Sequence, residues 1–185
     1  MQQIALLKIY LPVYFVLDLM LSFVLPSWRV YKQTGINPVT FGATDNAHDY
    51  IGFQMKVFTA LLALAICLFS FYPVGYRYLM PILYLMKPLT FWIGMGLMHL
   101  SLLWIIVAQY QMGRSWRIGI DEANQTELKQ EGLFGISRNP IFLGMIVTVL
   151  GLFLVLPNIL TAICFTCSLL LIHIQVRLEE DFLQK

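Results

Sequence analysis

The sequence is poor in charged residues, which make up only 12% of its 185 positions. A soluble domain normally carries about a quarter charged residues, so water is not the main solvent of this chain. The charges that are present nearly cancel, leaving a net charge of +2. A surplus this small and this scattered does not indicate a nucleic-acid-binding protein.

Cysteine is also scarce, and all 3 cysteines lie in apolar segments. Cys164 and Cys167 have the spacing of a redox or metal pair, but they have no basic neighbours and no further ligands nearby. We therefore interpret the cysteines as small side chains in helix packing. The sequence predicts no metal site, and it contains no internal repeat or low-complexity tract.

Apolar residues are abundant, at 59% of the chain. A bilayer core about 30 Å thick needs roughly 20 apolar residues per helix. Runs close to that length predict an all-α, polytopic membrane protein with about five transmembrane helices, at residues 4–25, 55–71, 89–108, 141–156 and 159–174. The apolar stretch 76–87 is broken by Pro81 and bounded by Pro88, which predicts an interfacial or re-entrant piece.

The last two apolar runs are separated only by Pro157 and Asn158. Proline stops a helix and asparagine tolerates a turn, so the two runs predict a tight C-terminal helical hairpin. In an antiparallel hairpin, the start of the first helix and the end of the second lie at the same membrane face. We divide the chain into N-terminal helices and loops (1–110) and a cap plus hairpin (111–185), within one integrated domain.

Lysine and arginine distribute unequally between the two faces that five spans define. By the positive-inside rule, the richer face is cytoplasmic and holds the C-terminus. The richer face holds nine of the 12 Lys and Arg residues, namely Arg29, Lys32, Lys56, Arg114, Arg117, Lys129, Arg138, Arg177 and Lys185, against Lys8, Arg77 and Lys87 on the other.

Ionisable residues inside spans are functional candidates because burying charge in a bilayer is costly. Lys8 can reach the membrane surface and His99 can bond to a neighbouring helix, whereas His173 stands near a helix end. Asp18 is a carboxylate in the middle of the first span and needs either a partner or a proton. The sequence leaves its role open.

The longest polar stretch of the chain runs from Gln111 to Asn139. A connection this long inside a compact protein is usually functional or disordered. Trp116, Phe134 and the glycines near them favour a folded cap. We expect this stretch to contain part of the functional site.

The polar stretch ends where the first arm of the hairpin begins. Asn139 suits the N-cap position and Pro140 the first helical position, so the free amides of this helix would attract an anion. Arg138 adds donors suited to a carboxylate or phosphate. The hairpin brings Arg138 near Glu179 and Glu180, which predicts a site for a zwitterionic or polyhydroxylated ligand, or alternatively a simple salt bridge.

Two further patterns on the hairpin have two readings each. Residues 173, 176, 177 and 180 share a helical face, which is either a helix end entering water or a wall of the site. Gly144 and Gly151 share a face on the other arm. They allow either close helix packing or the approach of a flat ligand group.

Four motifs follow one another in this part of the chain, and together they carry a resemblance. They are Gly113-Arg-Ser-Trp-Arg117, Leu128-x-x-x-Gly132-Leu-Phe134, Arg138-Asn-Pro-Ile-Phe142 and Glu179-Glu180-x-x-Leu183. In this order they resemble the membrane methyltransferases that include isoprenylcysteine carboxyl methyltransferase and the phospholipid N-methyltransferases. The resemblance covers residues 111–185. It implies methyl transfer from S-adenosylmethionine to a lipophilic acceptor or lipid delivered from the bilayer, without a metal.

The resemblance also implies roles for individual residues. It assigns the cofactor pocket to Thr126, Leu128, Gly132 and Phe134, with Arg138, Asn139, Pro140 and Phe142 as its floor and Glu179 or Glu180 holding polar groups of the cofactor. Arg138 and Glu180 would be catalytic. Arg177 and Gln175 would contact the substrate.

The sequence departs from the prenylcysteine enzymes at several positions. Asn139 and Phe142 stand where those enzymes usually have His and Tyr, Gln175 takes the place of a second family arginine, and the chain stops at Lys185, before the usual tail. A lipophilic acceptor other than prenylcysteine is therefore favoured. Two alternatives remain: a nicotinamide-dependent reductase of the sterol reductase type, which has a similar Arg-Asn-Pro junction, and a non-catalytic membrane protein that keeps the fold.

Overall fold

The computed structural model describes residues 2–39, 47–117 and 131–183, with the backbone alone at 2–3, 47–48, 114 and 179–183. The described residues are almost entirely helical, and an isolated bridge pairs Pro81 with Asn158. The predicted all-α class is confirmed.

The first helix is longer than the predicted span. It runs without a break from α1 (Gln2–Leu19) through a π-helical turn, η1 (Met20–Val24), into α2 (Leu25–Thr34). The apolar part and its extension cover 31 residues, Ile4–Thr34. At 1.5 Å per residue this is about 46 Å, more than the roughly 30 Å of a bilayer core, so α2 reaches the membrane boundary.

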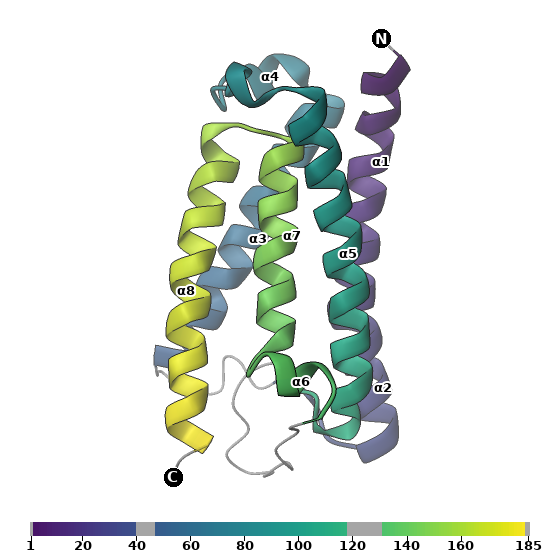
Figure 1. Ribbon diagram of the computed structural model, residues 1–185, viewed down its shortest axis with the longest axis vertical. Helices are drawn as coiled ribbons and strands as arrows, with labels where there is room; N and C mark the ends of the chain where they lie inside the picture. Colours follow the sequence, from purple (N-terminus) through teal and green to yellow (C-terminus); the bar gives the residue numbers. More distant parts are fainter. Residues whose placement is uncertain (1, 40–46, 118–130, 184–185) are drawn as a thin grey trace.

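Three further helices are long and apolar enough to cross a membrane: α3 (Ala47–Phe71), α5 (Pro88–Met112) and α8 (Ile159–Leu183). The apolar helix α7 (Pro140–Val155) is shorter, with 16 residues. These five helices run alongside one another in alternating directions (Figure 1). They coincide with the five predicted apolar segments, and the chain is a multi-pass membrane protein.

The two ends of the bundle differ, and we name them by what they contain. The hairpin end holds the N-terminus, α4 (Pro73–Arg77) and the turn between α7 and α8, whereas the site end holds α2, α6 (Leu133–Ile136), the start of α7 and the C-terminus (Figure 1). Within 76–87 the chain forms only the end of α4 and the 3-10 turn η2 (Leu83–Leu85). This agrees with an interfacial piece at the hairpin end.

The turn between α7 and α8 is fixed by a buried asparagine. Asn158 is 0% exposed, and its Nδ2 donates to the carbonyl oxygen of Leu156 at 2.9 Å and to Tyr76 Oη at 3.4 Å. Its Oδ1 accepts from the backbone N of Thr161 at 3.0 Å, capping α8. Burial holds the pKa of the Tyr76 phenol above its ordinary value. The predicted hairpin is confirmed.

Helices α5 and α7 approach each other closely because glycines face each other. A Cβ on Gly94 would lie 2.7 Å from the carbonyl oxygen of Gly151, and a Cβ on Gly151 would lie 2.8 Å from that of Gly94. A Cβ on Gly144 would clash with the side chain of Ile105. The glycines of α7 therefore serve helix packing, which is one of the two predicted readings.

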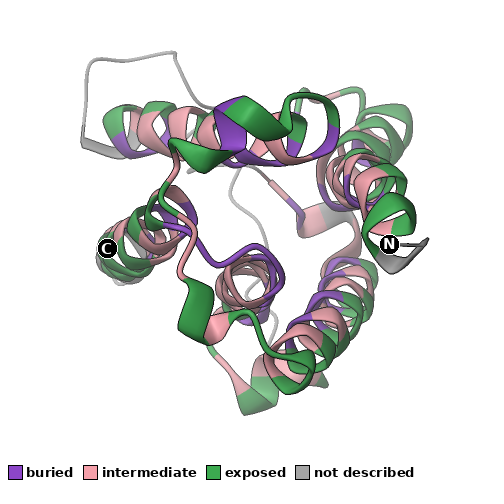
Figure 2. Cartoon of the chain, turned by 90° about the horizontal axis from the view of Figure 1, so that it is seen from above, coloured by how far each residue is buried: buried purple, intermediate pink, exposed green. Residues whose placement is uncertain are grey.

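Buried residues line the inner faces of the helices, and exposed residues cover most of the outside (Figure 2). The outward apolar side chains include Leu6, Leu100 and Leu170, which are 72%, 67% and 62% exposed and suit contact with lipid. The main core cluster includes Leu11, Met98 and Leu156. All three cysteines are free thiols, and Cys164 is 0% exposed, as its reading as a packing residue requires.

Candidate functional site

Helix α7 begins at the residues that the sequence predicts. Pro140 is in the first turn, and Asn139 is the N-cap, whose Oδ1 accepts from the backbone N of Phe142 at 3.5 Å. Arg138, just before the cap, is exposed. The start of α7 thus combines the positive end of a helix dipole with a guanidinium, and this pair suits an anionic group.

The start of α7 is held in place by α5. Trp104 Nε1 on α5 donates to the carbonyl oxygen of Pro140 at 2.9 Å, and Pro140 is among the fully buried residues. Sequence reasoning gave Trp104 no role. A tryptophan within an apolar span could have suggested one, because a buried indole N–H needs an acceptor.

Helix α7 is short relative to its neighbours, with 16 residues against 25 in both α5 and α8. Counting from the turn at the hairpin end, Pro140 is level with about residue 174 of α8. The remaining nine residues of α8 extend about 13 Å beyond the start of α7 at 1.5 Å per residue. Helix α7 therefore begins inside the bundle, and both α5 and α8 extend past its N-terminus.

Helix α6 lies beyond the N-terminus of α7 and is hydrogen-bonded to the end of α5. Gln111 Oε1 accepts from the backbone N of Leu133 at 2.9 Å. Gly132, just before α6, has a φ of 63°, and a Cβ there would lie 2.7 Å from the Gln111 side chain. The backbone conformation at position 132 thus favours glycine, and a larger residue there would also displace the Gln111 amide. Phe134 on α6 is half-buried.

The two described ends of the 111–139 stretch are folded. After α5 the chain forms the 3-10 turn η3 (Gly113–Ser115), followed by Trp116, which is only 3% exposed. At the other end lies α6. Thr126 and Leu128, predicted to contact a cofactor, lie outside the described residues.

On α8 the structure separates the two predicted substrate residues. Gln175 is 0% exposed, on the same inward face as buried Ile172. Arg177 is exposed, and its Nε donates to His173 Nε2 at 3.4 Å. Of these two residues, Gln175 is the one that faces into the bundle, near the level of Asn139. Glu179 and Glu180 continue α8 toward the site end, and their side chains are outside the description.

No group of three His, Cys, Asp or Glu side chains in the described part of the chain could hold a metal ion. Asp18 lies on the inward side of α1, four residues from Tyr14, whose Oη donates to the carbonyl oxygen of Met98 at 2.6 Å. Its Oδ1 is buried and has no hydrogen-bond partner among the described residues.

The fold and this arrangement define an integral membrane protein whose polar residues gather where α5, α6, α7 and α8 meet. The family model described as phospholipid methyltransferase matches residues 89–185, more than half of the chain. The chain belongs to the phospholipid methyltransferase family. A search of curated proteins and a search of solved structures found no match.

Proposed function

We propose that this protein transfers a methyl group from S-adenosylmethionine to a lipophilic acceptor that arrives from the bilayer. The observation that carries the proposal is the start of α7, where the Asn139 cap and Arg138 stand at the same end of the bundle as the end of α8. The family match supports methyl transfer as the reaction.

The residues at this end suit the polar groups of the cofactor. The positive end of the α7 helix dipole and the guanidinium of Arg138 suit its carboxylate, because a helix N-terminus and an arginine both favour anions. The acidic pair Glu179 and Glu180 suits its amino or ribose hydroxyl groups. We assign Gly132 and Phe134, at the start of α6, to the side of the cofactor site that is nearest the end of α5.

When bound, S-adenosylmethionine supplies a methyl group on a positively charged sulfur. A lone pair of the acceptor would form the new bond to this methyl carbon, and the electrons of the carbon–sulfur bond would stay on sulfur. The chain's own residues hold the two reactants in line and exclude water, and such positioning supplies most of the acceleration. We assign the orientation of the acceptor to Gln175, which is buried near the level of Asn139.

The distribution of basic residues supports a cytoplasmic location for this site. Arg29, Lys32 and Arg138 belong to the site end, whereas Arg77 and Lys87 belong to the hairpin end. The positive-inside rule therefore favours a cytoplasmic site end and C-terminus.

Calorimetry with purified full-length protein in detergent tests the cofactor. We expect S-adenosylmethionine to bind at micromolar concentrations, and Arg138→Ala or Glu180→Ala to abolish binding. Arg77→Ala is the matched control because it removes the same side chain from an exposed position at the hairpin end. Absence of binding heat, or tight binding of a reduced nicotinamide instead, would contradict the proposal.

A second experiment addresses the reaction. Protein incubated with a membrane lipid extract and S-adenosylmethionine labelled in its methyl group is expected to transfer label to a lipid-soluble product. Binding of the cofactor without any labelled product would favour a non-catalytic protein that keeps the fold.

A further inference from the structure

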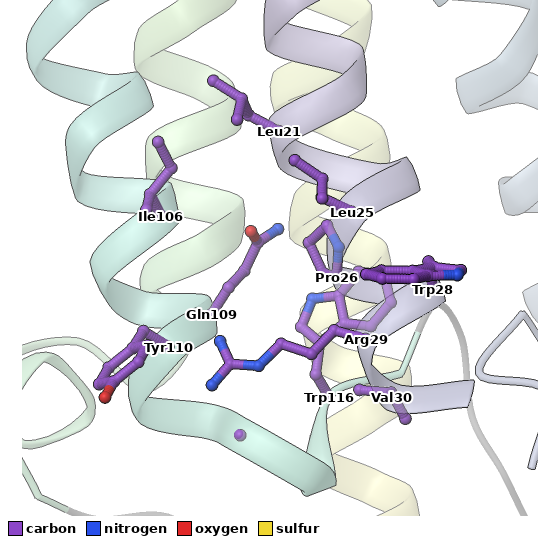
Figure 3. A pocket seen from close by; sticks show the side chains of 11 residues that line it. Leu21, Leu25, Pro26, Trp28, Arg29, Val30, Ile106, Gln109, Tyr110 and Trp116 are labelled. Carbon is purple, nitrogen blue, oxygen red and sulfur yellow. The ribbon is translucent and has the colours of Figure 1, made fainter. Parts of the chain in front are cut away.

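A pocket of about 290 Å³ lies between the first helix and α5 at the site end. Leu21 and Leu25 line it from η1 and α2, and Ile106 lines it from α5 (Figure 3). Gly113 and Trp116 border it next to η3. Its volume is near the lower end of the roughly 300–1,000 Å³ of small-ligand sites, enough for part of a larger amphiphile.

The pocket combines an apolar wall with one cation. The Arg29 side chain extends from α2 toward α5, where its guanidinium carbon lies 5.0 Å from the centroid of the Tyr110 ring (Figure 3). Among the described residues that line the pocket, none carries a carboxylate. A guanidinium that stacks on an aromatic ring keeps its edge donors available for a phosphate.

A second polar side chain of the pocket, Gln109, is buried and already makes a hydrogen bond within the fold. Gln109 Nε2 donates to the carbonyl oxygen of Ser22 at 2.5 Å, joining α5 to the π-helical turn η1. A π-turn leaves backbone carbonyls without their usual helical partners, and Gln109 satisfies one of them. This hydrogen bond holds the two sides of the pocket together, so Gln109 has a structural role. Arg29 is therefore the residue of the pocket that we expect to bind a ligand.

The depth of the pocket matches the membrane boundary. Trp28 and Tyr110 border it and are 59% and 68% exposed. Exposed tryptophan and tyrosine beside arginine and lysine are typical of the level of lipid headgroups, and basic pockets between helices at that level bind phospholipid headgroups. Leu25, 46% exposed, extends the apolar wall toward the bilayer interior.

We propose that this pocket is a phospholipid-binding site in which Arg29 binds the phosphate and one acyl chain lies along Leu21, Leu25 and Ile106. Gly113 and Trp116 belong to the 111–139 stretch, and the rest of the site is separate from the proposed methyl-transfer site. Its α2 wall lies outside the matched residues 89–185, and α5 contributes different residues to each place, with Trp104 and Gln111 on the α6 and α7 side. The inference goes beyond the proposed function and does not depend on it.

Native mass spectrometry of the full-length protein in detergent, without cofactor, tests the site. Three probes separate the two parts of the ligand: phosphatidylglycerol, diacylglycerol with the same chains, and glycerol phosphate. We expect phosphatidylglycerol to bind at least ten times more tightly than either of the others. Diacylglycerol binding equally well would overturn phosphate recognition, and glycerol phosphate binding equally well would reduce the pocket to a free-phosphate site.

Two variants locate the binding. Arg29→Gln is expected to weaken phosphatidylglycerol binding at least tenfold, and Leu21→Trp, which fills the pocket, is expected to do the same. Lys32→Gln is the matched control because Lys32 is an exposed cation on α2, 5.1 Å from the Trp28 ring, that does not line the pocket. Equal losses in Arg29→Gln and Lys32→Gln, or no loss in Leu21→Trp, would overturn the proposal.

Discussion

Trp104 on α5 donates a hydrogen bond of 2.9 Å to the carbonyl oxygen of Pro140, the first residue of α7. This contact fixes the depth at which α7 begins. Because the cap residue Asn139 and Arg138 directly precede Pro140, the indole of Trp104 also sets the position of the proposed anion site. A residue deep in an apolar helix therefore acts as a positioning residue for the polar end of its neighbour.

We expect Trp104→Phe to lower the free energy of unfolding by about 1 kcal/mol, the usual net value of one hydrogen bond. Affinity for S-adenosylmethionine should fall in the same variant, because α7 loses the contact that holds its start. Thermal unfolding and calorimetry measure the two effects. Trp92→Phe is the control, since Trp92 is 64% exposed on α5. Unchanged affinity in Trp104→Phe would contradict the positioning role.

The close approach of α5 and α7 gives a second prediction. A Cβ at position 151 would lie 2.7 Å from Met98 Cγ and 2.8 Å from the carbonyl oxygen of Gly94, so Gly151→Ala forces the helices apart. We expect a loss of about 1–3 kcal/mol in unfolding free energy. Gly96→Ala, on α5 with no atom within 4 Å of its Cβ, is expected to stabilise by about 0.5–1 kcal/mol. A stable Gly151→Ala protein would contradict the packing.

Membrane topology can be tested by labelling single cysteines with a membrane-impermeant maleimide, after Cys67, Cys164 and Cys167 are replaced by alanine. A cysteine at Gln33, exposed at the site end, is expected to be protected in intact cells and labelled after lysis. One at Tyr78, 82% exposed at the hairpin end, is expected to react in intact cells. Asn158, at the same end, is unsuitable as a probe because it is 0% exposed. The reverse pattern would overturn the orientation.

Asp18 gives a prediction about stability. Its Oδ1 is buried and without a hydrogen-bond partner among the described residues, and an uncompensated buried carboxylate destabilises a folded protein. We expect Asp18→Asn to raise the midpoint of thermal unfolding by a few degrees in detergent. A lower midpoint would show that the carboxylate makes a favourable interaction in the folded protein, for example with a bound cation.

Part of the candidate site could be predicted from sequence because it depends on neighbours along the chain. The cap at Asn139 and the helix start at Pro140 are local, and the structure confirms both. The sequence could not predict which of the two side chains, Gln175 or Arg177, is buried. Both fit the polar boundary of α8, but only the rotation of that helix against the bundle decides that Gln175 is buried and Arg177 exposed.

The sequence by itself determined the five apolar helices, the hairpin turn and the start of α7, because these follow from the length of apolar runs and from proline and asparagine at fixed positions. Only the tertiary structure decided the depth at which α7 begins, the contact between Trp104 and Pro140, and the pocket beside Arg29. These features depend on how far one helix lies along another. That offset is set by contacts such as Gly94 against Gly151, between residues distant in the chain.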